Sequence, residues 1–320
     1  MSIQETLQTA LQGALAGRSL LTWLDYTPEE IRYVLDMSKQ VKREKNAIHE
    51  RFKGKTLALL FEKRSTRTRC AFETAFGEEG GHPVFLSTAD IQLGAKESIE
   101  DTARVLGRMF NAIQFRGFQQ STVETLANYS GVPVYNGLTD AFHPTQVLAD
   151  ILTLEENFGE CKGKKLRFVG DGRNNVARSL LVISAQLGVD FSIITPKALY
   201  PDPELLKACE PLAQRSGASI TVCDDLDGVA GADALYTDVW ISMGEESKLE
   251  ERRALLKPYQ INQTLMDMTG RKDVIFLHCL PALKGEEVSA DVIDGSQSRV
   301  WDQAENRKHT IKAILLATLR

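Results

Sequence analysis

The sequence predicts an α/β protein with two doubly wound parallel-sheet domains and an active site in the cleft between them. The length of 320 residues suits two domains of ordinary size. Short apolar runs with strand character alternate with longer stretches of helical periodicity along most of the chain. Strands that alternate with helices form parallel sheets covered on both faces.

The first half begins its alternation with a helix announced by Thr27, Pro28 and Glu30. Thr27 can cap the helix, Pro28 suits its first position, and Glu30 completes a capping box. Helical periodicity follows again from Ile99 to Met109 and after Pro144. The strands expected between these helices are Thr56–Phe61, Pro83–Leu86, Ala112–Phe115 and Pro133–Asn136.

In the second half, strands and helices alternate again after a polar, lysine-rich stretch, Gly159–Lys165. We interpret this stretch as the domain linker. The domains are accordingly expected at residues 1–150 and 151–305. An amphipathic helix is expected from Asn306 to Leu319. The expected strands are Leu166–Val169, Phe191–Ile194, Ser219–Val222, Ala234–Thr237 and Val274–Leu277.

Composition narrows the classes of function. Hydrophobic residues make up 43% and charged residues 25%, with a net charge of -5. A mildly acidic protein has no overall attraction for nucleic acid or anionic membranes, so an anionic substrate needs a local positive field. No apolar run is long enough for a membrane span, and the N-terminus lacks the pattern of a signal peptide. We therefore expect a cytoplasmic protein.

The cysteines and histidines predict neither a disulfide framework nor a metal site. The five cysteines are widely spaced without a C-x-x-C pair, and the five histidines form no H-E-x-x-H motif. We expect reduced packing or surface thiols at Cys70, Cys161, Cys209 and Cys223.

A basic segment follows the first strand. Ser65 and Thr66 stand where the next helix begins, so free backbone N–H groups, hydroxyls and the helix dipole form a seat for an anion. Arg67 can add a bidentate grip on phosphate oxygens. The alternatives are a solvated basic surface or a nucleic-acid patch.

Two further strands end at residues suited to the same ligand. Arg116 ends the strand Ala112–Phe115, and His143 and Gln146 follow the strand Pro133–Asn136. Ligands of open parallel sheets bind beyond the carboxyl ends of the strands. An imidazole and an amide there suit a polarised carbonyl oxygen and an NH₂ group.

Polar segments also follow strands of the second half. Gly170-Asp171-Gly172 suggests a dinucleotide site, but Asn175 replaces the third glycine of that fingerprint. The other segments are Asp238–Gly244 and His278–Ala282.

The S-T-R-T-R motif at Ser65 and the H-P-T-Q motif at His143 resemble those of the aspartate/ornithine carbamoyltransferase family, and the resemblance covers nearly the whole chain. It implies a homotrimer, or a higher assembly of trimers, in which Gln92 reaches the site of a neighbouring subunit. It also implies that residues 306–320 return to the first domain. The residues implied to bind carbamoyl phosphate are Ser65, Thr66, Arg67, Thr68, Gln92, Arg116, His143, Gln146, Cys279, Leu280 and Arg307.

The second domain selects the acceptor. Ser242-Met243-Gly244 and the H-C-L-P-A motif at Cys279 resemble the ornithine-specific members of the family. The resemblance implies that the δ-amine of L-ornithine attacks carbamoyl phosphate to give L-citrulline and phosphate, without a cofactor or metal. The ornithine-binding residues would be Asn175, Asp238, Ser242 and Met243, and the catalytic residues would be Arg116, His143, Asp238 and Cys279.

Three alternatives stay open at this point. The acceptor could be putrescine, N-acetylornithine or aspartate. The glycines at Gly170 and Gly172 could belong to a nicotinamide-dependent dehydrogenase, although their fingerprint is broken. The chain could also be a non-catalytic relative, which should lack a motif residue.

Overall fold

The computed structural model describes residues 10–45, 47, 49–87, 91, 97–241 and 249–319. The chain forms two compact units, residues 1–149 with 306–320, and residues 150–305. In the described part of the chain, no helix is both long enough and apolar enough to cross a membrane.

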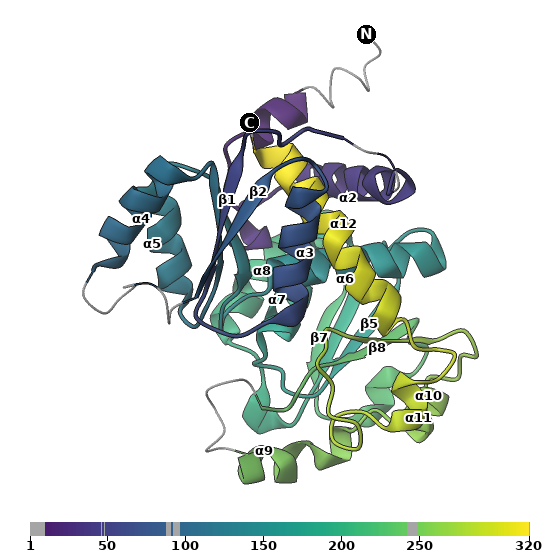
Figure 1. The fold of residues 1–320 in the computed structure, drawn as a ribbon. Helices are drawn as coiled ribbons and strands as arrows, with labels where there is room; N and C mark the ends of the chain where they lie inside the picture. The colour runs from purple at the N-terminus through teal and green to yellow at the C-terminus, as the bar shows by residue number, and fades with distance from the viewer. Residues whose placement is uncertain are drawn as a thin grey trace. The chain divides into compact units, whose positions relative to one another are not determined.

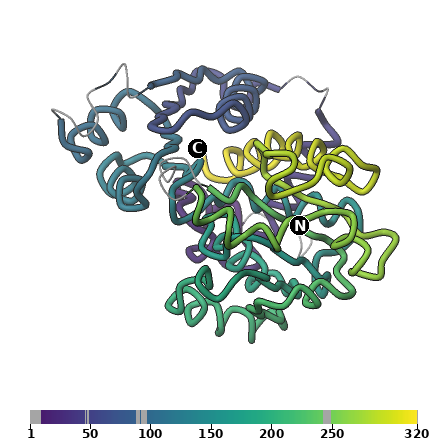
Figure 2. The backbone as a smooth tube through the Cα atoms, turned by 90° about the horizontal axis from the view of Figure 1, so that it is seen from below, coloured from purple at the N-terminus to yellow at the C-terminus, as the bar shows by residue number. Residues whose placement is uncertain are grey.

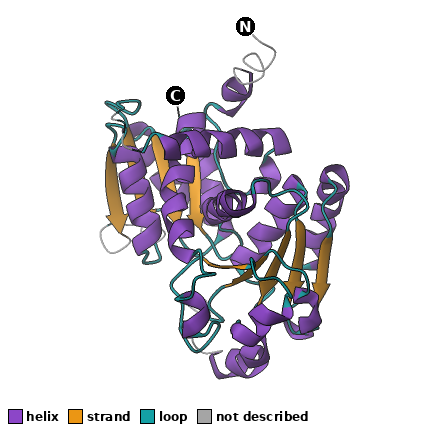
Figure 3. Cartoon of the chain, turned by 90° about the vertical axis from the view of Figure 1, so that its right-hand side faces the viewer, coloured by secondary structure: helices purple, strands orange, loops and turns teal. Residues whose placement is uncertain are grey.

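The first unit contains a four-stranded parallel sheet in the order β2-β1-β3-β4. Figures 1 and 3 show its strands lying side by side between helices. The strands are β1 (Thr56–Phe61), β2 (His82–Ser87), β3 (Ala112–Arg116) and β4 (Val134–Leu138). The helices are η1 (Trp23–Asp25), α2 (Pro28–Arg43), α3 (Thr66–Gly77), α4 (Ile99–Met109) and α5 (Gln120–Ser130).

The two faces of this sheet bury different helices. Leu60 and Phe115 belong to the apolar cluster that contains Leu106 of α4 and Leu126 of α5. On the opposite face, the hydroxyl of Tyr135 in β4 lies 2.8 Å from the hydroxyl of Thr318 in the last helix. Alternation of side chains along each strand produces this division.

The second unit contains a five-stranded parallel sheet in the order β7-β6-β5-β8-β9. Its strands are β5 (Lys165–Val169), β6 (Asp190–Ile194), β7 (Ile220–Cys223), β8 (Ala234–Thr237) and β9 (Ile275–His278). Its helices are α7 (Asn175–Leu187), η2 (Lys197–Leu199), α8 (Pro203–Ser216), η3 (Leu226–Val229), α9 (Leu249–Leu256), η5 (Lys257–Tyr259), α10 (Gln263–Met268) and α11 (Ala290–Ile293).

Both sheets have the strand order that creates a ligand site. The direction of the strand order reverses between β1 and β3 in the first unit, and between β5 and β8 in the second. At such a switch point the loops leave the sheet in opposite directions, which opens a crevice beyond the carboxyl ends of the strands. The polar motifs therefore stand where a doubly wound sheet binds its ligand. The two-sheet α/β fold expected from the sequence is confirmed.

The chain changes unit before the predicted linker, between residues 149 and 150. The stretch that begins at Gly159 is the short connection between α6 (Pro144–Phe158) and β5, inside the second unit, and the N–H of Gly163 donates to Gly188 at 2.8 Å. The chain instead changes unit inside two helices, α6 and α12 (Val300–Thr318). Glycine and lysine suit any short exposed connection, so composition did not distinguish this loop from a linker.

The last helix begins six residues before the predicted start. Figure 2 shows α12 as a continuous yellow coil, which has 19 residues from Val300. Its first turn buries Val300 but exposes Trp301 and Asp302. This turn therefore carries too little apolar periodicity to be recognised from the sequence.

Candidate active site

In the first unit, the candidate site starts at the junction of β1 and α3. Ser65 caps α3, and its hydroxyl accepts a hydrogen bond from the N–H of Thr68 at 3.2 Å. A serine in this capping position starts the helix immediately after the strand. The N-terminal end of α3, with the side chain of Arg67 half-buried there, thus lies at the switch point of the sheet. This arrangement suits an anion.

The hydroxyl of Thr68 joins two buried arginines. It accepts a hydrogen bond from Nη1 of Arg116 and another from Nη2 of Arg307, each at 3.2 Å. A hydroxyl oxygen has two acceptor sites and one proton. With both acceptor sites filled by guanidinium N–H groups, the hydroxyl proton of Thr68 is left to donate to another acceptor.

Arg307 connects this group to the start of α6. Its Nη1 donates to Oε1 of Gln146 at 2.6 Å, and its Nη2 also approaches the hydroxyl of Thr145 at 3.3 Å. The side chain is nearly fully buried. A buried arginine needs several acceptors to offset the loss of water, and its planar fork fixes their relative positions.

His143 stands beside these arginines as a neutral imidazole. Burial lowers the pKa of His143 well below its usual value. The guanidinium groups of Arg307, Arg116 and Arg67 lower that pKa further, in that order of effect. A neutral imidazole retains one N–H donor, so His143 can polarise a carbonyl oxygen at neutral pH without adding a charge.

Two contacts tie the loops of this site together. The carboxylate of Glu62, after β1, accepts the N–H of Phe118, after β3, at 3.0 Å. The buried ammonium of Lys63 pairs with Asp140, which precedes His143, at 2.5 Å. Loops that follow three different strands are thus held in one arrangement before any ligand binds, which lowers the cost of ordering them on binding.

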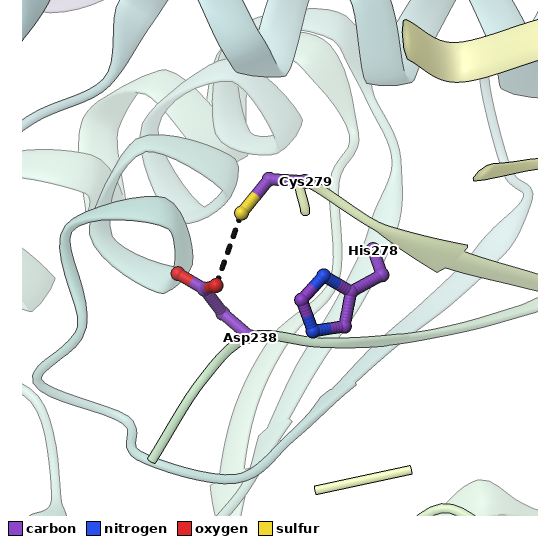
Figure 4. Close-up of side chains that lie close together, drawn as sticks. All are labelled: Asp238, His278 and Cys279. Carbon is purple, nitrogen blue, oxygen red and sulfur yellow. Dashed lines mark hydrogen bonds between the residues drawn. The ribbon is translucent and has the colours of Figure 1, made fainter. Parts of the chain in front are cut away.

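The second unit places Asp238 at the centre of its own cluster. Directly after β8, its Oδ2 accepts from the amide nitrogen of Asn174 at 2.9 Å. Its Oδ1 accepts from the N–H of Val239 at 2.8 Å and from the thiol of Cys279 at 3.0 Å. Figure 4 shows Asp238 and Cys279 pointing toward one another, with His278 beside them. A buried carboxylate with such partners suits an ammonium ligand.

Asn174 contacts Asp238, whereas its neighbour Asn175 is the residue that the resemblance assigns to the ornithine carboxylate. The side chain of Asn174 caps α7 by accepting the N–H of Val176 at 2.7 Å, and its amide nitrogen reaches Asp238. Asn175 is the first residue of α7, where its backbone carbonyl accepts the hydroxyl of Ser179 at 2.7 Å. The capping position turns the side chain of Asn174 toward the carboxyl end of β8.

A buried network fixes the loop that carries Cys279. The N–H of Leu280 donates to Nδ1 of His278 at 2.8 Å, and Nε2 of His278 lies 3.1 Å from a carboxylate oxygen of Glu287. Because Nδ1 accepts, the proton of the neutral ring lies on Nε2 and is donated to Glu287. The backbone of Leu280 has a φ of 58°. This left-handed conformation is rare for leucine. The hydrogen bond from the N–H of Leu280 to the His278 ring helps to hold it.

Asp238, His278 and Cys279 also have the residue types of metal ligands. One potential ligand atom from each lies within 4.8 Å of the others. These groups have protein partners, since the Cys279 thiol donates to Asp238 and the His278 ring lies between Leu280 and Glu287. Hydrogen bonding thus accounts for the cluster.

Comparisons with known proteins give one family across both units. The model of the carbamoyl-P binding domain of aspartate/ornithine carbamoyltransferases matches residues 18–156, and the model of their Asp/Orn binding domain matches residues 162–318. The chain belongs to the aspartate/ornithine carbamoyltransferase family. The resemblance expected from the motifs is thereby confirmed.

Relatives in this carbamoyltransferase family are similar over almost their full lengths. The ornithine carbamoyltransferase of Caldanaerobacter subterraneus subsp. tengcongensis is 67% identical, with 95% of this chain and 98% of the relative covered. That of Pseudothermotoga lettingae is 66% identical, with the same coverage. The solved structure of ornithine carbamoyltransferase from Pyrococcus furiosus superposes with a TM-score of 0.91 at 47% identity, with 95% of this chain and 98% of that chain covered.

The carbamoyltransferase motifs divide between the two units. Thr68, Arg116, His143, Gln146 and Arg307 gather in the first unit, and Asp238 and Cys279 in the second. Three predicted site residues, Gln92, Ser242 and Met243, lie outside the described residues, as does Gly244.

Sequence reasoning missed several supporting residues of this carbamoyltransferase. Thr145 and Asp140 carried a detectable signal, because each is a polar residue in the loop or first helical turn after β4. Nothing in the sequence marked Glu287, which pairs with His278, or Gln303, whose Oε1 accepts the N–H of His278 at 3.0 Å, because each is a routine polar residue of a loop or helix. Their burial makes them structural.

Proposed function

We propose that this chain transfers the carbamoyl group of carbamoyl phosphate to the δ-amine of L-ornithine, giving L-citrulline and phosphate. The observation that carries the proposal is the group formed by Thr68, Arg116 and Arg307 beside neutral His143, at the switch point of the first sheet. A phosphate and a polarised carbonyl are the ligands that such a group suits. Relatives named ornithine carbamoyltransferase support the same acceptor.

In the proposed mechanism the first unit binds carbamoyl phosphate. Ser65, Thr66 and Arg67 hold the phosphate at the start of α3, as a helix N-terminus favours an anion. The Thr68 hydroxyl, Arg116 and the His143 ring donate to the carbonyl oxygen. Because these donors are fixed in advance, they stabilise the charge that this oxygen gains in the tetrahedral intermediate. Gln146, held by Arg307, contacts the carbamoyl NH₂.

The second unit binds the amino acid in this proposal. Asp238 pairs with the α-ammonium, with Asn174 or Asn175 at the carboxylate end, and Ser242 and Met243 line the side chain. The neutral δ-amine attacks the carbonyl carbon, the C–O bond to phosphate breaks, and the amine loses a proton. Only about one alkylamine in 10³ is neutral near pH 7.4, so the site has to favour that form. Cys279 lies beside the attacking nitrogen, with the carbonyl of Leu280 close to the carbamoyl NH₂.

No covalent intermediate is required, so Cys279 is not a nucleophile in this scheme. Holding the two reactants in contact contributes on the order of 7–11 kcal/mol of the barrier reduction. The nicotinamide-dependent alternative receives no support from the family match.

The proposed assembly is a homotrimer in the cytoplasm, in which Gln92 completes the site of a neighbouring subunit. Mixing inactive Arg67→Ala and Gln92→Ala proteins, with reversible dissociation, should restore activity in hybrid sites that have both native residues. Mixtures that stay as inactive as the separate variants would contradict a shared site.

Citrulline formation tests the function directly. The purified chain should form citrulline from carbamoyl phosphate and ornithine, and should turn over putrescine, N-acetylornithine and aspartate far more slowly. Activity that favours one of these amines would reassign the acceptor. Absence of product with all four would refute the carbamoyltransferase proposal.

A further inference from the structure

Helix α9 places an arginine against the turn that follows β5. The guanidinium of Arg252 lies 3.0 Å from Oδ2 of Asp171, and the side chains are only 11% and 10% exposed. Its neighbour Arg253 is 40% exposed and pairs with Glu250 and Glu286, neither of which belongs to this half of the site. Removing one member of a buried ion pair leaves an uncompensated charge, whereas an exposed pair contributes little.

Residues 170–174 form a turn directly after β5, and hydrogen bonds to Asp171 hold this turn in place. Oδ1 of Asp171 accepts the N–H of Arg173 at 2.9 Å, and its backbone carbonyl accepts the N–H of Asn174 at 3.0 Å. Gly172 packs so closely that an added Cβ would lie 2.6 Å from the carbonyl oxygen of Leu199. The turn therefore has little freedom to adopt another conformation.

The same turn presents Asn174 to Asp238. Contacts thus run from Arg252 to Asp171 at 3.0 Å, through the turn to Asn174, and from Asn174 to Asp238 at 2.9 Å. Asp238 in turn accepts the thiol of Cys279.

The two carboxylates near Asn174 have different partners. Asp171 faces a guanidinium, while Asp238 faces an amide, a backbone N–H and a thiol, all of them neutral donors. An incoming ammonium group therefore meets a carboxylate at Asp171 that is already paired with a guanidinium. At Asp238 it meets a carboxylate whose hydrogen bonds, among the described residues, come from an amide, a backbone N–H and a thiol. Arg252 therefore separates a structural carboxylate from a ligand-binding one.

We propose that Arg252 is a positioning residue for the amino-acid substrate: by neutralising and holding Asp171, it fixes the turn that presents Asn174 to Asp238. The inference rests on the proposed function, because it assigns the ammonium of ornithine to Asp238. Arg252 acts through Asp171 and the turn, and has no role in binding carbamoyl phosphate.

A set of variants tests this role. Arg252→Met should raise the KM for ornithine roughly tenfold, within the range for residues that act through others. The KM for carbamoyl phosphate should stay within about twofold of the wild-type value, because the pair lies in the other unit. Asp171→Asn should have a similar effect, and the double variant should be no worse than either single one. Arg252→Lys should restore part of the ornithine affinity.

Arg253→Met is the matched control, since it removes a cation from the adjacent position of α9 whose ion-pair partners, Glu250 and Glu286, lie outside the turn of residues 170–174. It should leave both KM values unchanged. Thermal unfolding of each variant reports whether it folds. Titration with 2-aminopentanoate, which has ornithine's chain without the δ-amine, reports binding of the amino acid apart from catalysis.

Three results would overturn the inference. They are an unchanged ornithine KM in an active Arg252→Met protein, an equal rise of both KM values, and equal effects of Arg252→Met and Arg253→Met. Failure of the wild-type protein to form citrulline is a different outcome, because it removes the proposed function itself.

Discussion

The Thr68 hydroxyl offers the sharpest test of the carbamoyl phosphate half. Thr68→Val keeps the branched shape of the side chain but removes the oxygen that accepts from Arg116 and Arg307, at 3.2 Å each. Both guanidiniums are buried. A hydrogen bond to a charged group contributes about 1.5–3 kcal/mol. The bonds from Arg116 and Arg307 are already present in the free enzyme, so the loss in kcat/KM comes from the bond that the Thr68 hydroxyl donates to the carbonyl oxygen as that oxygen gains charge. One such bond corresponds to a loss of roughly 10- to 100-fold in kcat/KM.

The assay is initial-rate citrulline formation with carbamoyl phosphate varied at saturating ornithine. Thr74→Val is the control on the same helix, because the Thr74 hydroxyl donates only to backbone carbonyls within α3 and its side chain is exposed. That variant should keep wild-type kcat/KM. A Thr68→Val protein within about threefold of wild type would refute this assignment, because threefold corresponds to about 0.65 kcal/mol, less than one hydrogen bond to a charged group contributes.

Three further predictions concern the rest of the site. Asp238→Asn should raise the KM for ornithine by about 10²-fold, because a neutral amide cannot pair with the ammonium; an equal loss of carbamoyl phosphate binding would contradict this. The pKa of His143 is lower in the folded chain than its usual value of 6.5. As the pH falls below 6.5, the unfolded chain therefore binds a proton at His143 before the folded chain does, and the free energy of unfolding decreases. Denaturant titrations at several pH values should therefore show a shallower acid loss for His143→Gln, and parallel curves would disprove the assignment. Prolonged treatment with EDTA should leave the rate of citrulline formation unchanged, and a loss reversed by zinc would show that Asp238, His278 and Cys279 hold a metal.

Much of the fold was predictable because each strand is short, apolar and followed by a polar motif. The β1–α3 junction combines a buried strand, a capping serine and basic residues in consecutive positions, so local chemistry alone located it. The same holds for Asp238 after β8. The carboxyl-end rule for parallel sheets then grouped motifs that stand far apart in the sequence.

Other features depended on tertiary contacts that leave no local trace. Arg252 sits in a charged helical stretch, where nothing distinguishes its buried side chain from the exposed Arg253. Asn174 and Asn175 are adjacent and chemically identical, so only the capping geometry of α7 decides which of them reaches Asp238. Glu287 gained its role from a histidine nine residues earlier.

The central claim is that carbamoyl phosphate and ornithine react while held by the Ser65–Thr68 segment and by Asp238. A crystal structure with a bisubstrate analogue, in which a phosphonate is joined to the δ-nitrogen of ornithine, tests it most directly. We expect the phosphonate at the N-terminus of α3 and the α-ammonium on Asp238. An analogue bound with its phosphonate away from Arg67, or with its ammonium away from Asp238, would contradict it.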